Sequence, residues 1–221
     1  MLKETYFTVD NIGDVSDLFL KKISPVIKHA GTAGLDLKKT ALLVTDMQNY
    51  FLDPDVHAFI PSARAIIPNI KKLQNLFIEN NLCLIHTHHG NTKKDAGNMS
   101  KWWNKLLDRH SVDAQIIDEL MTEHAIVVEK TQYDAFYKTN LEEILKNRHI
   151  SQIIITGVMT HLCVEATARS AFVRDFDVYF AIDGTATYNR DFHLASLLNL
   201  AHGFASPVVT RAIEKHFEYA Q

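Results

Sequence analysis

The sequence predicts one doubly wound α/β domain, a six-stranded, mostly parallel sheet with helices on both faces. Short apolar runs rich in β-branched residues recur along the chain without the alternation of a half-exposed strand, so they fit strands buried on both faces. Segments with helical spacing separate them, and strands that alternate with helices form parallel βαβ units. The predicted strands are 41–44, 82–85, 126–128, 153–155, 178–182 and 207–209.

The predicted helices lie between these strands. Ile66, Ile70, Leu73 and Phe77 recur at intervals of three and four residues, which places them on one face of a helix. The same spacing appears within 141–145, 168–172 and 194–198.

Residues 1–35 do not follow this alternation. Turn-forming sequences at 10–14 and 31–34 flank a short helix that Pro25 interrupts. We therefore expect an N-terminal extension, 1–35, that packs on the domain or on a partner subunit, and a domain at 36–221.

The composition narrows the classes of partner. Hydrophobic residues make up 47% of the 221 residues and charged residues 22%, with a formal net charge of −3, which is typical of a globular protein and disfavours nucleic acid as a partner. The longest apolar run, 178–182, is far shorter than the roughly 20 residues of a membrane helix. The N-terminus lacks a signal-peptide pattern, and two cysteines are too few for a disulfide framework. We expect a cytoplasmic protein that acts on a small molecule without contacting a membrane.

Common cofactor motifs are missing. None of the eight glycines forms a Gly-x-Gly pair, so the dinucleotide fingerprint is absent, as is a phosphate-binding Gly-Lys-Ser/Thr loop. No serine has glycine two residues away on both sides, which excludes the α/β-hydrolase elbow. We expect no cofactor.

Three reactive side chains follow predicted strands. Asp46 comes after the first strand, Lys130 after the third, and Cys163 after the fourth, where a helix pattern begins. Each has an ordinary structural explanation, as a turn cap, a solvated cation or a small buried side chain. However, the carboxyl ends of parallel strands meet at one edge, where ligands bind, and a helix N-terminus favours a thiolate. Cys83 lies inside a strand and is expected to be core.

Around these residues the sequence resembles the isochorismatase-like hydrolase family, also called the cysteine hydrolase superfamily, which includes nicotinamidases and N-carbamoylsarcosine amidases. The resemblance extends from about Ala41 to Thr210. Three motifs carry it: LVTDMQNYF at 43–51, EKTQYDAF at 129–136, and ITGVMTHLCVEATA at 155–168.

The resemblance implies roles for individual residues. In that family an aspartate, a lysine and a cysteine form the catalytic triad, and Asp46, Lys130 and Cys163 stand in the matching motifs. It also implies a doubly wound sheet, a homo-oligomer, and a cis peptide between Val158 and Met159.

Two departures from the family pattern affect the function. Nicotinamidases usually carry an Asp-x-His metal motif, which is absent here; His86 and His88 share one face of a strand, but we expect substrate-facing or solvated histidines and no metal. Several siderophore-pathway isochorismatases have glycine where Cys163 stands. The thiol therefore favours amide chemistry.

The expected reaction is hydrolysis of a small amide through a thioester. Asp46 takes the proton of Cys163, Lys130 lowers the pKa of the thiol, and the backbone N–H groups of Met159 and Cys163 bind the oxyanion. A rival arrangement pairs the thiol with His161. Two other functions remain open: a vinyl-ether hydrolase of the isochorismatase type with Asp46 as general acid, and a non-catalytic binding protein.

Substrate selection is expected from side chains around the crevice. Aromatic residues can stack on a flat ring or an acyl chain, and the polar, glycine-containing loop 90–104 is interpreted as a lid. The candidate substrate-binding residues are Phe51, His88, Trp103, Tyr133, Phe136 and Met159.

Overall fold

A six-stranded parallel sheet forms the centre of the molecule, as the computed structural model shows for residues 2–29, 31–103 and 105–219. The strand order is β3-β2-β1-β4-β5-β6, and every neighbouring pair is parallel. The predicted doubly wound sheet is therefore confirmed. The strands are β1 Thr40–Thr45, β2 Cys83–His89, β3 Ile126–Lys130, β4 Gln152–Val158, β5 Asp177–Ala186 and β6 Ser206–Val208.

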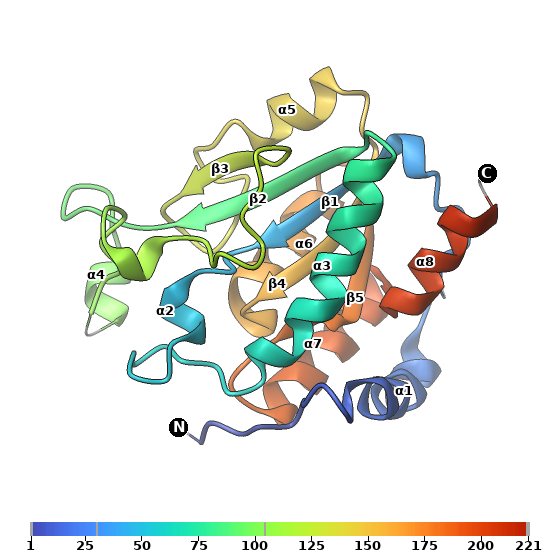
Figure 1. Ribbon diagram of the computed structural model, residues 1–221, viewed down its shortest axis with the longest axis horizontal. Helices are drawn as coiled ribbons and strands as arrows, with labels where there is room; N and C mark the ends of the chain where they lie inside the picture. The colour runs from blue at the N-terminus through green and yellow to red at the C-terminus, as the bar shows by residue number, and fades with distance from the viewer. Residues whose placement is uncertain (1, 30, 104, 220–221) are drawn as a thin grey trace.

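Helices cover both faces of the sheet. In Figure 1, α3 lies in front of the strands, where α8 packs against it, and α6 lies behind them and contacts α7. The predicted helical segments correspond to α3, α5, α6 and α7, whereas α2, α4 and α8 were not predicted. The bounds are α1 Ile12–Ile23, α2 Asn49–Leu52, α3 Ala63–Glu79, α4 Met99–Trp102, α5 Leu141–Asn147, α6 Glu165–Phe172, α7 Arg190–Gly203 and α8 Thr210–Tyr219.

One strand differs from its predicted environment. The run 126–128 was expected to be buried on both faces, but β3 is an edge strand and the side chain of Val127 is 52% exposed. An apolar run of three residues does not distinguish the edge of a sheet from its centre, because the difference lies in which strands pair beside it.

The N-terminal segment packs on the domain. Helix α1 contacts α7 and β5, and Tyr6, Phe7, Phe19 and Ile23 are buried in the same hydrophobic core as the sheet. Pro25 stands in a short 3₁₀ turn that directly follows α1. In the described part of the chain, no helix is both long and apolar enough to cross a membrane.

The order of the strands reverses between β1 and β4, and ligands bind at such a switch point. Thr45 at the end of β1 pairs with Gly157 in β4. Gly157 has φ +101°, and a Cβ there would lie 2.0 Å from the carbonyl oxygen of Thr45. Glycine thus permits a backbone approach that places Asp46 beside the turn after β4.

We expect Gly157→Ala to lower the free energy of unfolding by more than about 3 kcal/mol, because overpacking and an unfavourable φ add together. Gly13→Ala is the matched control: Gly13 lies in α1 with no atom within 4 Å of an added Cβ, so it is expected to stabilise by up to about 1 kcal/mol. Urea unfolding measures both. A Gly157→Ala protein as stable as the wild type would contradict this close approach.

Candidate active site

A buried ion pair lies at the carboxyl end of the sheet. The Lys130 ammonium is 2.8 Å from Oδ2 of Asp46, and both side chains are 0% exposed. Lys130 ends β3 and Asp46 follows β1, so the lysine side chain reaches across the end of β2, which lies between them. Lys130 also donates to the carbonyl of Gln132 at 2.9 Å.

Thr87 of β2 fixes the carboxylate of Asp46. The Thr87 hydroxyl donates to Oδ1 of Asp46 and accepts from the Asp46 backbone N–H at 3.0 Å. Asp46 has φ +49°, a conformation that is uncommon for a residue other than glycine and that clusters at functional sites. Thr87 is not among the predicted site residues, although its place on the strand next to β1 follows from the parallel register.

Cys163 joins this pair from the turn after β4. It lies in a π-helical turn, Thr160–Val164, that precedes α6, a type of turn frequent at functional sites. Its thiol lies close enough to Asp46 and Lys130 for both charges to act on its pKa. The peptide bond between Val158 and Met159 is cis. The structure thus brings the three predicted residues together.

Burial opposes each charge of the Asp46–Lys130 pair, and each charge stabilises the other. Burial alone would raise the pKa of Asp46, but the Lys130 ammonium and the hydrogen bonds from Lys130 and Thr87 hold that pKa below its usual value. Burial would likewise lower the pKa of Lys130, but the Asp46 carboxylate and Cys163 raise it. Both groups are ionised at neutral pH.

The pKa of the Cys163 thiol differs from the prediction. We expected Lys130 and the helix N-terminus to lower the pKa of Cys163, but burial, aided by the Asp46 carboxylate, raises it to about 12 despite the opposing effect of Lys130. The charge of Lys130 is already neutralised by Asp46 at 2.8 Å. Cys163 is therefore a neutral thiol at rest.

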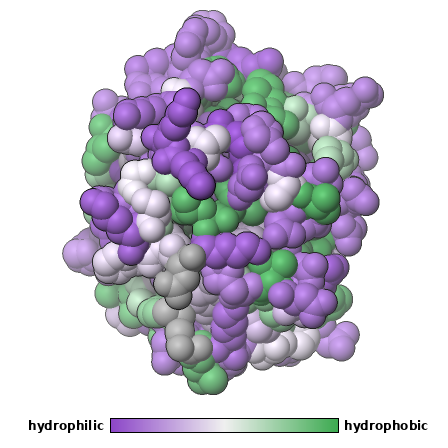
Figure 2. Space-filling view, turned by 90° about the vertical axis from the view of Figure 1, so that its left-hand side faces the viewer, coloured by the Kyte–Doolittle hydropathy of each residue, from purple (hydrophilic) through white to green (hydrophobic). Residues whose placement is uncertain are grey.

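A cavity of about 50 Å³ opens beside Cys163. Figure 2 looks onto this end of the molecule, where apolar residues appear within a largely polar surface. Four of the predicted substrate-binding residues line the cavity, namely Phe51, Trp103, Tyr133 and Met159. The other lining residues are Tyr50, His57, Ala58, His89, Asn91, Met99, Lys105, Leu106, Leu107, Leu162, Cys163 and Tyr188.

Two predicted substrate-binding residues lie elsewhere. Successive side chains of a strand point to opposite faces, so in β2 it is His89, two residues after Thr87, that lines the cavity, and His88 does not. Phe136 stacks on Phe176 at 5.9 Å and is covered by the Arg174 guanidinium at 4.9 Å. The structure therefore does not place His88 and Phe136 in the cavity lining.

The two histidines that share one face of β2, His86 and His88, belong to no metal-ligand set among the described residues. His86 points toward α3, where its Nε2 is 3.1 Å from Oε1 of Gln74. Among the described residues, no group of three histidines, cysteines or carboxylates is arranged to hold a metal ion. The nicotinamidase-type metal motif therefore does not fit these residues.

His161 also lies outside the cavity lining. Its ring stacks on Phe192 at 4.4 Å, and its Nδ1 is 2.5 Å from the Thr187 hydroxyl. Burial lowers the pKa of this imidazole to about 4. These contacts do not support the rival pairing of His161 with the thiol.

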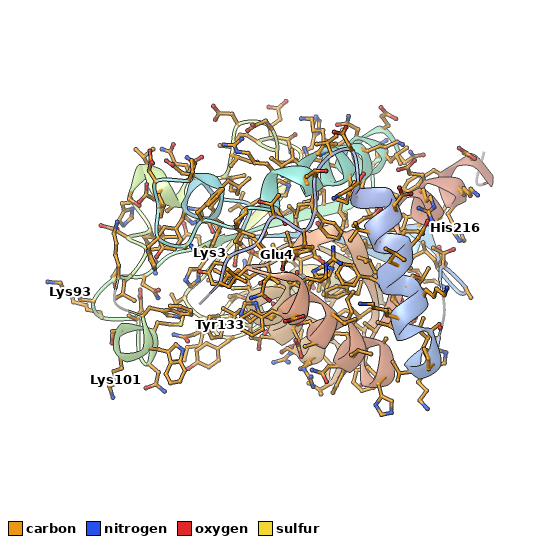
Figure 3. The ribbon with its side chains drawn as sticks, turned by 90° about the horizontal axis from the view of Figure 1, so that it is seen from below. Lys3, Glu4, Lys93, Lys101, Tyr133 and His216 are labelled. Atoms are coloured by element: carbon orange, nitrogen blue, oxygen red, sulfur yellow. The ribbon has the colours of Figure 1, made fainter. Side chains whose placement is uncertain are left out.

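The cavity walls come from segments far apart in the chain. Within the predicted lid, Trp103 donates from Nε1 to the Tyr133 hydroxyl at 2.7 Å; residue 104 lies outside the described residues. On the opposite side, Lys3 donates to the carbonyl of His57 at 2.5 Å and lies 4.8 Å from the centre of the Tyr188 ring. Figure 3 shows Lys3 at the same end of the molecule as Tyr133. His57 and Tyr188 are not among the predicted site residues, although Tyr188 follows β5.

Most of the chain is similar to known proteins. Residues 40–212 match the isochorismatase domain family. The chain is 38% identical to Nicotinamidase 3 of Arabidopsis thaliana over 76% of this chain and 83% of that protein. It is 30% identical to an isochorismatase of Bacillus subtilis over 80% of this chain but only 58% of that protein. A cysteine hydrolase from Pseudomonas syringae has a similar structure, with a TM-score of 0.82, 25% identity and coverage of 89% of this chain and 99% of that one.

Buried histidines make a testable prediction about acid stability. Burial lowers the pKa of His86 to about 4 and that of His89 to about 3, below the value of about 6.5 in an unfolded chain. The unfolded chain binds more protons in that window, so stability is complete above about pH 6.5 and falls as the pH drops toward 4. We expect a loss of about 1.4 kcal/mol per pH unit for each such histidine.

Urea unfolding at pH 7 and pH 5 measures this loss. The variant His86→Gln removes one titrating group and should reduce the loss of unfolding free energy between pH 7 and pH 5 by the amount expected for one histidine. Equal free energies of unfolding at the two pH values in the wild type would contradict the prediction.

Proposed function

This chain belongs to the isochorismatase domain family, and from that membership and the geometry of its cavity we propose that this hydrolase cleaves the C–N bond of a small-molecule amide through Cys163. The resemblance predicted from three motifs is thereby confirmed at the level of the family. One observation carries the proposal: a fully buried aspartate–lysine pair acts on the pKa of the only thiol that lines the cavity in the described part of the chain.

In the proposed first step, Cys163 attacks the carbonyl carbon of the amide. The S–C bond forms while the thiol proton moves to Asp46, and the carbonyl electrons become an oxyanion. Because the thiol has a pKa near 12 at rest, proton transfer accompanies attack and a preformed thiolate is not required. A positioned general base of this kind typically contributes about 10²- to 10⁴-fold in rate. Lys130 stays protonated and balances the negative charge as it moves.

The remaining steps return the enzyme to its starting state. Asp46 gives its proton to the leaving nitrogen as the C–N bond breaks, which releases ammonia or an amine and leaves a thioester. Water then attacks the thioester and gives a proton to Asp46; the C–S bond breaks, the acid leaves, and Cys163 regains its proton. We assign oxyanion binding to the backbone N–H groups of Met159 and Cys163.

The cavity supports a small, flat substrate. Its volume of about 50 Å³ favours a small molecule over a polymer. Aromatic side chains form much of the lining, among them Phe51, Trp103, Tyr133 and Tyr188, and such side chains stack on planar groups. We propose a carboxamide or carbamoyl compound of this size.

A screen of small amides tests the proposal. We expect the wild type to release ammonia from at least one member of a panel of nicotinamide, N-carbamoyl amino acids and ureido acids, and Cys163→Ala to lose at least 10³-fold in rate. Isochorismate serves as the comparison substrate. If Cys163→Ala kept its activity, or if isochorismate were cleaved and no amide were, the amidase proposal would be wrong and Asp46 would act as a general acid on a vinyl ether.

Neutral substitutions separate the roles of Asp46 and Lys130. Asp46→Asn removes the carboxylate that raises the pKa of Cys163 and leaves the Lys130 cation beside it. We therefore expect faster alkylation of Cys163 by iodoacetamide at pH 7, together with a loss of about 10²- to 10⁴-fold in amide hydrolysis. Lys130→Met removes the cation that lowers this pKa, so both alkylation and hydrolysis should fall.

Alkylation is followed by mass spectrometry, with Cys163→Ala reporting any reaction of the second cysteine, Cys83. Equal alkylation rates in wild type, Asp46→Asn and Lys130→Met would mean that these two charges do not set the ionisation of the thiol.

A further inference from the structure

A fully buried histidine that the proposed reaction does not use lies close to the nucleophile turn. His193 belongs to α7 and is 0% exposed. Aromatic rings of Tyr6, Phe7 and Phe19 surround it, with centroids 5.3, 5.4 and 4.9 Å away. All three come from the N-terminal segment, which precedes the residues that match the family. Figure 3 shows α1, the helix that carries Phe19, running beside α7.

Two hydroxyl groups reach the same ring nitrogen of this histidine. The Nδ1 atom of His193 is 3.1 Å from the Tyr6 hydroxyl and 3.1 Å from the Thr160 hydroxyl. The Tyr6 oxygen accepts the backbone N–H of Thr187 at 3.0 Å, which leaves its own proton to donate to Nδ1. Burial lowers the pKa of His193 to about 3, so the ring is neutral and its Nδ1 can act as the acceptor.

These bonds converge on the two segments that flank Cys163. Thr160 begins the π-helical turn in which Cys163 lies. Thr187 precedes Tyr188, which lines the cavity. The Thr187 hydroxyl is hydrogen-bonded to His161, which belongs to the same π-helical turn as Cys163. One tyrosine at the N-terminus is thus linked to the nucleophile turn by two routes, through His193 and through Thr187.

We propose that Tyr6 and His193 are positioning residues that hold the π-helical turn so that the sulfur of Cys163 stays against Asp46 and Lys130. The N-terminal segment is then part of the catalytic apparatus. The interpretation of turnover rests on the proposed amidase function, whereas the placement of the thiol does not. Displacement of a reacting group by about 1 Å can cost about 100-fold in rate, so such a support has a measurable effect.

The variant Tyr6→Phe tests the inference, because it removes only the hydroxyl and keeps the ring. We expect alkylation of Cys163 by iodoacetamide at pH 7 to become at least fivefold faster, because a displaced sulfur loses part of the burial and of the Asp46 influence that raise its pKa. With an amide substrate, kcat should fall about tenfold while KM changes less than threefold. The control is Ile23→Val, which removes one methylene from a residue buried in α1 with no link to this network. Both variants are measured at least 15 °C below their melting temperatures.

The control separates positioning from general destabilisation. Alkylation in Ile23→Val should stay within 1.5-fold of the wild type even if its melting temperature falls as far as that of Tyr6→Phe. Wild-type alkylation in Tyr6→Phe, or an equal acceleration in Ile23→Val, would overturn the inference. Because alkylation needs no substrate, this arm decides the inference even if no amide is hydrolysed.

A second variant keeps the inference testable if Tyr6→Phe does not fold. Thr160→Val removes the other hydroxyl on Nδ1 of His193 and should speed alkylation to a similar extent. When both single variants fold, the double variant should react no faster than the faster of the two, because both changes break the same connection. Fully multiplicative gains in alkylation rate would show that Tyr6 and Thr160 act separately, and would overturn the inference.

Discussion

The buried ion pair between Asp46 and Lys130 is the constraint on which the architecture of the site depends. Removing two charges from water is unfavourable, and only close pairing with further hydrogen bonds offsets that cost. The pair therefore requires β1 and β3 to end at the same level, with Thr87 and the carbonyl of Gln132 as additional partners. A shift of either strand by one residue would leave a charge buried without its partner.

A second set of bonds keeps these strand ends in register. Gln48, two residues after Asp46, donates to the carbonyls of His89 and Ala114 at 2.8 and 2.5 Å and accepts the backbone N–H of His89 at 2.9 Å. It therefore ties the segment after β1 to the end of β2 and to the loop before β3. The close contact of β1 with β4 at Gly157 also holds these strand ends together, so the sheet itself fixes the positions of the site residues.

The sequence could predict what depends on local pattern. Continuous apolar runs indicated buried parallel strands, and the reactive residues after them converge because parallel strands end at one edge. Features that depend on neighbouring elements were missed or wrong: β2 continues through His86–His89 despite their polarity, and strand parity selects His89 over His88. The pKa of Cys163 was predicted in the wrong direction because its sign depends on the depth of burial and on the pairing of Lys130 with Asp46.

The neutral state of the thiol fits the rest of the site. The thiolate, not the thiol, reacts with oxidants and binds metals. A cysteine whose pKa is raised by burial is therefore protected from both before a substrate binds. In the proposed reaction, the carbonyl carbon of a bound substrate is what makes proton transfer to Asp46 favourable. The reactivity of Cys163 then depends more on the distance between its sulfur and the Asp46 carboxylate than on a lowered pKa of the thiol. This explains why a hydrogen-bond network that reaches as far as Tyr6 would support the π-helical turn that holds the sulfur.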